Sequence, residues 1–569
     1  MRRPAPRSAP ALLAAALLAA LALPARPARA QQPNAMDDAG ASAPEDPGPA
    51  LPAPAAATPP RAAATPAPAR AAPTLAEIRS AVDAVLRAQG LALWATWTSG
   101  EKLDVAGAWK GREGVLSKEA LVRVGQALAA AQGEERRALD WLRSYLAGEI
   151  LAREIAEPAA RLAAARAAAT YPWDRKSVPL RDTTALLAAE PDALRRASIA
   201  SAAGQAAARL LPLAAARDER LAAAVRTLGW DGTLALAADL RGASPDALAA
   251  LADRVLARTE ELHGAVLDDL ARRELSLSFT ALRTRDLPRL LRPMALADAF
   301  PAARAVADAT AVLGGLGLEL RGDHPIVLDA DARPGKIGRP LAVPVDVPGD
   351  VRLSLVPSPG LDAAAALLHE LGAAEAYAHA TVPQLEFRRL GPPALSASWA
   401  LLAEGVTASP EWLSTHGVEG DRLRETVRAA AARRLQAVRG AAARVLFEIR
   451  RAREPARAAE IWRAVSERAF GHADEELAPA VRLDPDPLLR AAEELRAELL
   501  AAQLEAHLAR LAGDGPWWRS TRAGEWLRRT WAEGTRATPE ERSASMGYAA
   551  LDADALEALW RARCGLAAR

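Results

Sequence analysis

The sequence is poor in several residue types that carry chemistry. Its 569 residues include one cysteine, Cys564, four tyrosines and seven histidines. A single cysteine excludes an internal disulfide framework and every zinc site built from cysteines. The scarcity of tyrosine leaves few hydroxyl groups of the kind that stabilise an oxyanion. Candidate catalytic residues are therefore sought among the few histidines and their acidic neighbours.

The chain also has no marked excess of charge of either sign. It carries 72 basic and 70 acidic residues, a formal net charge of +2, and the two signs are interspersed. A nucleic-acid-binding protein needs a basic stripe or patch, so the sequence argues against a nucleic-acid partner. No internal repeat recurs at a fixed period, which argues against a solenoid.

Residues 1–30 have the pattern of a secretory signal peptide. Arg2 and Arg3 precede an apolar run over residues 11–23, and an A-x-A cleavage pattern ends at Ala30. The apolar run is too short to span a bilayer, and no cysteine near the cleavage site could carry a lipid anchor. We predict export to the periplasm or the outside of a bacterial cell, with no membrane span after cleavage.

The remaining chain divides by composition. Residues 31–73 are rich in proline and alanine and cannot bury a core, so we expect an extended tether. From a capping-box pattern at Thr74 onward, apolar residues recur every three or four positions, which predicts a mainly α protein. Short strands are expected between residues 314 and 357. We separate an N-terminal helical region over 74–310 from a second region over 311–569.

The most informative pair in the sequence is His369 and Glu370, in a predicted helix over residues 367–379. In an H-E-x-x-H helix, two histidines four residues apart bind one zinc ion and the glutamate acts as general base. Here the position of the second histidine is Ala373. A helix-packing histidine beside a solvated glutamate would give the same pair, so the surroundings must decide.

Those surroundings resemble a known family. The run LHELG at 368–372, the D-x-x-x-R-x-x-K pattern at 329–336, and the EFRRLG and PEWL segments at 386–391 and 410–413 are similar to the thimet oligopeptidase and oligoendopeptidase F family of helical zincin metallopeptidases. The resemblance implies a large helical fold with a small β-sheet before the zinc helix. It also implies a third ligand, a glutamate on the next helix, at the position of Ala397.

Two of the three expected zinc ligands are thus alanine, which predicts a catalytically inactive pseudo-peptidase. His369 is then a vestigial ligand, Glu370 is a vestigial general base with a raised pKa, and no cofactor is expected. In the family, an edge strand of the sheet holds extended peptides. We assign that role to Val351, Leu353 and Leu355, so a peptide or protein partner remains possible without the metal.

Two alternatives stay open. An active zinc-dependent oligopeptidase with a non-standard metal site could use Glu404, because the run EGVTA at 404–408 resembles the E-G-x-A sequence in which other gluzincins place their third ligand. His379 is about 15 Å further along the helix than His369, too far to share one ion. A scaffold with a filled cleft is the other. The family's oxyanion-stabilising helix matches residues 488–499, which contain no tyrosine or histidine.

Four tryptophans between residues 517 and 531 could form a carbohydrate platform or anchor terminal helices in the core. The general burial of tryptophan favours the core. Those four residues are Trp517, Trp518, Trp526 and Trp531.

Overall fold

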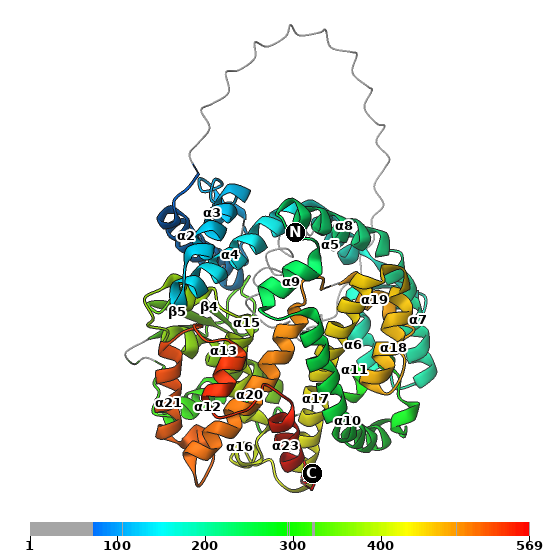
Figure 1. Cartoon of the computed structure of the whole chain (residues 1–569). Coiled ribbons are helices and arrows are strands. Elements are labelled where there is room, and N and C mark those ends of the chain that lie inside the picture. The colour runs from blue at the N-terminus through cyan, green and yellow to red at the C-terminus, as the bar shows by residue number, and fades with distance from the viewer. Residues whose placement is uncertain are drawn as a thin grey trace, which may run out of the picture.

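The computed structural model describes residues 72–567, apart from residues 105, 293, 295, 321, 323, 324 and 485 (Figure 1). Helices dominate the described residues, which confirms the mainly α prediction. Among the described helices, none combines the length and the apolar character needed to cross a bilayer. The predicted signal peptide, and the predicted tether up to residue 71, lie outside the described residues.

The first half of the described chain is a succession of helices with one hairpin. Thr74 and Glu77 form the predicted capping box, because the Glu77 amide donates to the Thr74 hydroxyl at 3.2 Å and the Glu77 carboxylate accepts from the Thr74 amide at 2.7 Å. The elements are α2 (Leu75–Ser99), α3 (Lys118–Ala130), α4 (Gly133–Glu154), α5 (Ala156–Ala168), β1 (Thr170–Trp173), β2 (Lys176–Pro179), α6 (Thr183–Ala189), α7 (Ala193–Ala208), α8 (Leu211–Thr227), α9 (Thr233–Arg241) and α10 (Pro245–Leu275).

The second half holds the small sheet and the longest helix. Its elements are α11 (Leu287–Leu290), α12 (Ala305–Gly315), β3 (Ile326–Asp329), β4 (Leu341–Asp346), β5 (Asp350–Ser354), α13 (Leu361–Ala378), α14 (Leu385–Arg389), α15 (Pro393–Gly405), α16 (Pro410–Ser414), α17 (Gly420–Arg453), α18 (Ala458–Phe470), α19 (Ala478–Leu483), α20 (Arg490–Ala512), α21 (Thr521–Ala532), α22 (Pro539–Ser545) and α23 (Asp554–Arg563).

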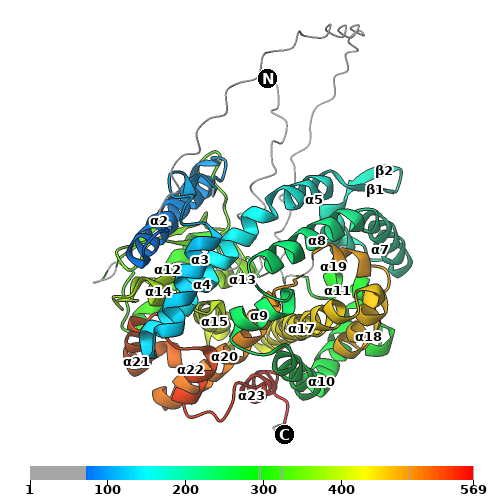
Figure 2. The ribbon, with the colours of Figure 1, turned by 45° about the horizontal axis from the view of Figure 1, so that its top comes forward.

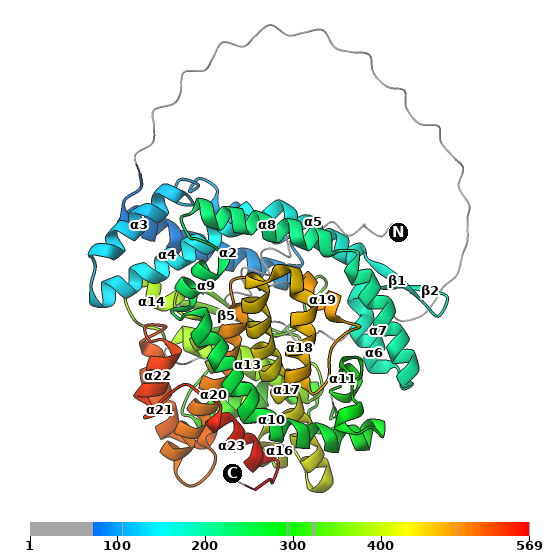
Figure 3. The ribbon, with the colours of Figure 1, turned by 45° about the vertical axis from the view of Figure 1, so that its right-hand side comes forward.

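The main hydrophobic core is built around α17, which packs against α10, α18 and α20. Because α10 belongs to this core, the core crosses residue 310. A second core joins α2, α3 and α4 to Leu385 and Leu390 around α14. Figures 2 and 3 show α5 and α8 side by side on the way to the β1–β2 hairpin. Both cores therefore contain residues from each side of residue 310.

The predicted strands lie in a three-stranded sheet with the order β3–β5–β4. β5 pairs in parallel with β3 and antiparallel with β4. The expectation that Val351, Leu353 and Leu355 mark an edge strand was wrong: β5 is the central strand, and all three side chains are buried. An alternating apolar pattern indicates that one face of a strand is buried, but it does not indicate whether the strand has one neighbouring strand or two.

The D-x-x-x-R-x-x-K segment forms a compact ion cluster at the end of β3. Arg333 pairs with both carboxylate oxygens of Asp329, at 2.8 and 2.5 Å, and the Lys336 ammonium donates to Asp329 at 2.8 Å. These hydrogen bonds from Arg333, together with those of Lys336, hold the pKa of Asp329 well below its ordinary value. The Lys336 side chain is fully buried, so Asp329 is its counter-charge.

We expect Asp329→Asn to lower the free energy of unfolding by about 2 kcal/mol, because the variant weakens the charge-assisted hydrogen bonds of a buried ammonium. Urea unfolding at pH 7 measures the change. Asp331→Asn is the matched control: Asp331 is exposed, and Lys336 contacts its main-chain oxygen. Equal stabilities of the two variants would contradict the role given to Asp329.

A second buried ion pair ties α7 to the segment before α11. The Arg196 guanidinium donates to Asp286 at 2.8 Å and to the main-chain oxygen of Pro191 at 2.8 Å, and Asp286 also accepts from the Arg283 amide at 3.0 Å. Both side chains are almost completely buried, with 2% and 4% exposed. Each charge therefore depends on the other for its compensation.

Three of the four C-terminal tryptophans are buried. Trp517, Trp518 and Trp531 belong to the main core, which confirms that they anchor the terminal helices. Trp526 is half-buried and lies edge-on to Trp399 of α15. Trp526 and Trp531 of α21 both contact Trp399 and so attach α21 to α15.

Candidate functional site

The candidate site lies where α13 and α15 pack against each other. Gly372 of α13 makes this contact close, because a Cβ atom at that position would lie 2.6 Å from the Trp399 main-chain oxygen and 2.7 Å from Ala403. Any larger residue would push the two helices apart. The close approach sets His369, one turn earlier on α13, opposite the end of α15.

The residue that faces His369 is Glu404. The His369 Nδ1 atom lies 2.9 Å from the Glu404 Oε2 atom, and both side chains are largely buried. Ala397 lies about two turns away on α15 and packs against a small apolar cluster that includes Ala497 and Ala501 of α20. The geometry thus places Glu404, the weaker sequence candidate, opposite His369.

Glu404 is also part of a network of ion pairs that the sequence analysis did not predict. Its Oε1 atom lies 3.5 Å from Arg434 of α17, and Arg434 donates to both oxygens of Glu498 on α20, at 2.9 and 2.8 Å. Burial alone lowers the pKa of Arg434, but the charges of Glu498 and Glu404 outweigh it and hold that pKa above its ordinary value. Arg434 is thus a permanent cation beside His369.

A neighbouring pair extends the network toward the C-terminus. Arg563 of α23 donates to Glu505 of α20 at 2.6 Å and to the Gly405 main-chain oxygen at 3.1 Å. Glu505 also raises the pKa of Arg434 through its charge, after the larger effects of burial, Glu498 and Glu404. Ionic side chains from α15, α17, α20 and α23 therefore lie around His369 of α13.

The residues present do not fit a catalytic zinc site. Such a site takes three protein ligands and leaves one position for water, whereas Ala373 offers no ligand atom and Glu404 is held beside Arg434. Within residues 72–567, outside the gaps noted above, no three His, Cys, Asp or Glu side chains converge as metal ligands. The site therefore brings together one imidazole, from His369, and one carboxylate, from Glu404.

Glu370 is also engaged. Its Oε2 atom accepts a hydrogen bond from the Ala342 amide of β4 at 2.8 Å. Burial raises the pKa of Glu370, in the direction expected from the sequence, while nearby His369 acts in the opposite sense. The carboxylate expected as a general base therefore forms a hydrogen bond that links α13 to strand β4 of the sheet.

Side chains occupy two backbone groups of β4 and one backbone group just beyond its end. Glu370 takes the Ala342 amide, Arg389 donates to the Val345 main-chain oxygen at 3.3 Å, and Arg388 donates to the Val347 main-chain oxygen at 2.9 Å. Pro344, between them, has no amide hydrogen to offer. An extended peptide would find few unpaired backbone groups on this edge.

The EFRRLG segment connects distant parts of the chain. Glu386 is buried and pairs with Arg79 of α2 at 2.6 Å, and Phe387 packs edge-on against Trp141 of α4. The Gly391 amide donates to the Thr535 hydroxyl at 3.2 Å. The segment therefore joins α2, α4 and the C-terminal part of the chain.

Further along α13, a second acidic side chain is buried. Glu375 is 1% exposed, its Oε2 atom lies 3.4 Å from the His379 Nδ1 atom, and its Oε1 atom has no hydrogen-bond partner among the described residues. Burial raises the pKa of Glu375 to about 8. His379 thus contacts Glu375, which lies one turn earlier along the chain.

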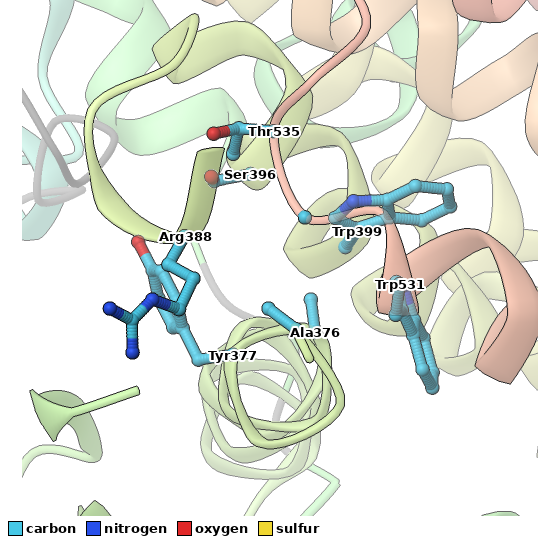
Figure 4. A pocket seen from close by; sticks show the side chains of 9 residues that line it. Ala376, Tyr377, Arg388, Ser396, Trp399, Trp531 and Thr535 are labelled. Atoms are coloured by element: carbon cyan, nitrogen blue, oxygen red, sulfur yellow. The ribbon is translucent and has the colours of Figure 1, made fainter. Parts of the chain in front are cut away.

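A small cavity lies between α13, α15 and α21, and Figure 4 shows its lining. Its walls include Tyr377, Ser396, Trp399 and Trp531, and its volume is about 10 Å³. That volume admits about one water molecule. The cavity is therefore too small for a peptide side chain.

The predicted oxyanion region belongs to α20, and its acidic residues have structural partners. Glu493 accepts a hydrogen bond from the Ala394 amide in the first turn of α15 at 3.0 Å, and Glu498 neutralises Arg434. The sequence does contain a signal for the Arg434–Glu498 contact, because α17 carries arginines among many alanines. An arginine on such an apolar helix face is buried, and a buried arginine requires a carboxylate or carbonyl partner.

Comparisons with known proteins gave no assignment: no family model matches the chain, and no curated protein matches its sequence.

Proposed function

We propose that this chain is an exported, metallopeptidase-like protein of the oligopeptidase type that binds a peptide or protein partner and cleaves no peptide. One observation carries the proposal: the vestigial residues are already paired inside the fold, His369 with Glu404 at 2.9 Å and Glu370 with the Ala342 amide at 2.8 Å. Activation of a zinc-bound water requires a full ligand set, which Ala373 interrupts. The sequence motifs around His369 support the family part of the proposal.

The closed edge of β4 restricts how a partner is held. β3 forms the other edge of the sheet, and Val327 on that strand is 51% exposed. For an extended peptide, addition to β3 is the mode that this sheet leaves more open. A thermal-shift screen with unstructured peptides tests partner binding, because a ligand of the folded state raises the melting temperature.

The catalytic part of the proposal is tested by zinc content and peptide cleavage. We expect the protein purified without chelator, after exposure to excess zinc, to retain less than about a tenth of an equivalent, because two side chains do not hold the ion tightly. Elemental mass spectrometry measures the metal, and a panel of quenched fluorescent peptides measures cleavage. Near one equivalent of zinc, with cleavage abolished in Glu370→Gln, would refute the proposal.

That refuting result would establish the second candidate, an active zinc-dependent oligopeptidase with a non-standard site. One observation favours this candidate: Glu404 and His369 lie within 2.9 Å of each other, as two ligands of one ion would. For such an enzyme, Glu404→Gln should remove both zinc and cleavage. For a silent protein, the same variant changes stability alone.

A further inference from the structure

Arg434 lies where two acidic side chains from different helices converge. Glu404 approaches from α15 at 3.5 Å and Glu498 from α20 at 2.8 Å, and the Arg434 side chain is 9% exposed. Two carboxylates around one buried cation, with an imidazole at hydrogen-bond distance from one of them, is also the arrangement of donor groups around a divalent metal. In this chain the cation is the guanidinium of a protein side chain, and no bound ion is needed to neutralise the two carboxylates.

The helix geometry shows how little separates this arrangement from a metal site. Ala373 lies one turn beyond His369 on α13, so the two side chains point to the same side of the helix. Its neighbour Gly372 contacts Ala403, next to Glu404 on α15. A ligand at position 373 would therefore join His369 and Glu404.

We propose that the guanidinium of Arg434 has replaced a divalent metal ion as the cation between α13, α15 and α20, and that it closes a latent site formed by His369 and Glu404. This inference rests on the proposed function, because an active enzyme would carry its metal. The guanidinium is always charged. It donates to both oxygens of Glu498 and lies 3.5 Å from Glu404. A metal ion could bind Glu404 only after that contact is broken.

The experiment separates loss of a ligand from occupation of the site by Arg434. The first variant, Ala373→His, supplies the missing ligand alone. The combined variant adds Arg434→Met and Glu498→Gln to this change. It therefore supplies the ligand and also removes the competing cation and its partner Glu498. We expect the combined variant to bind about one equivalent of zinc, with a dissociation constant at least tenfold lower than that of Ala373→His alone. Calorimetric titration with zinc chloride measures both.

Asp362→His, at an exposed position of the same helix, controls for surface binding by an added histidine and should take up no stoichiometric zinc. Equal zinc affinity of Ala373→His and the combined variant would overturn the inference, as would a folded combined variant that binds no zinc. If the combined variant fails to melt cooperatively, Ala373→His with Arg434→Gln carries the same expectations, because glutamine keeps a donor for Glu498.

The two proposals fail in different measurements. Failure of the proposed function is detected in the unsubstituted chain, as bound zinc and peptide cleavage. Failure of the inference about Arg434 is detected in the variants, as unchanged zinc affinity, while the unsubstituted chain remains free of zinc and inactive. Each result is therefore assigned to one proposal.

Discussion

Glu375→Gln is expected to be more stable than the unsubstituted protein at pH 9 and to lose this advantage as the pH falls toward 5. Burial raises the pKa of Glu375 from an ordinary 4.5 to about 8 in the folded protein. The folded state therefore binds a proton that the unfolded state releases between these pH values. Stability that is fully present below about pH 4.5 is lost as the pH rises through 8.

The expected size of the effect is large. At about 1.4 kcal/mol per pH unit, the interval corresponds to on the order of 5 kcal/mol as an upper limit. Urea unfolding at pH 5, 7 and 9 measures the slope in each protein. Glu525→Gln, at an exposed position of α21, is the control and should follow the unsubstituted protein. An unchanged slope in Glu375→Gln would show that Glu375 is ionised in the folded state.

Asp286→Ala is expected to lower the free energy of unfolding by about 3–5 kcal/mol, since it leaves the Arg196 guanidinium buried without a counter-charge. Asp286 also accepts a hydrogen bond from the Arg283 amide, which would be left without this partner. The change should be visible as a decrease in the denaturant midpoint with little change in slope.

A double variant tests whether the loss comes from the orphaned charge. Arg196→Met with Asp286→Leu removes both charges and fills the space with apolar atoms, so it should recover most of the stability lost in Asp286→Ala. A double variant less stable than the single one would instead assign the loss to packing. Thermal unfolding of the three proteins at pH 7 makes the comparison.

The sequence predicted those features that depend on neighbours along the chain. The capping box at Thr74 and Glu77, the helical pattern and the position of the strands within 314–357 follow from spacing over a few residues. The missing ligand at Ala373 also needs no structure, because its position relative to His369 is fixed by the helix repeat.

Features that depend on how helices meet could not be obtained in this way. Glu404 lies opposite His369 only because Gly372 lets α15 approach α13 closely, and counting residues from sequence motifs placed the third ligand position at Ala397 instead. Arg434 and Glu498 come from two further helices, and their pairing follows from tertiary packing. The central position of β5 could not be predicted for the same reason. It depends on tertiary pairing with β3 on one side and with β4 on the other.

The occupied edge of β4 has a consequence for behaviour at high concentration. Exposed strand edges let one molecule pair with the next and begin aggregation. With the Ala342 amide held by Glu370 and Pro344 unable to donate, β4 resists such intermolecular pairing. Glu370, which no longer needs to serve chemistry in the proposed function, would thus protect solubility, and its replacement should promote association of otherwise folded molecules.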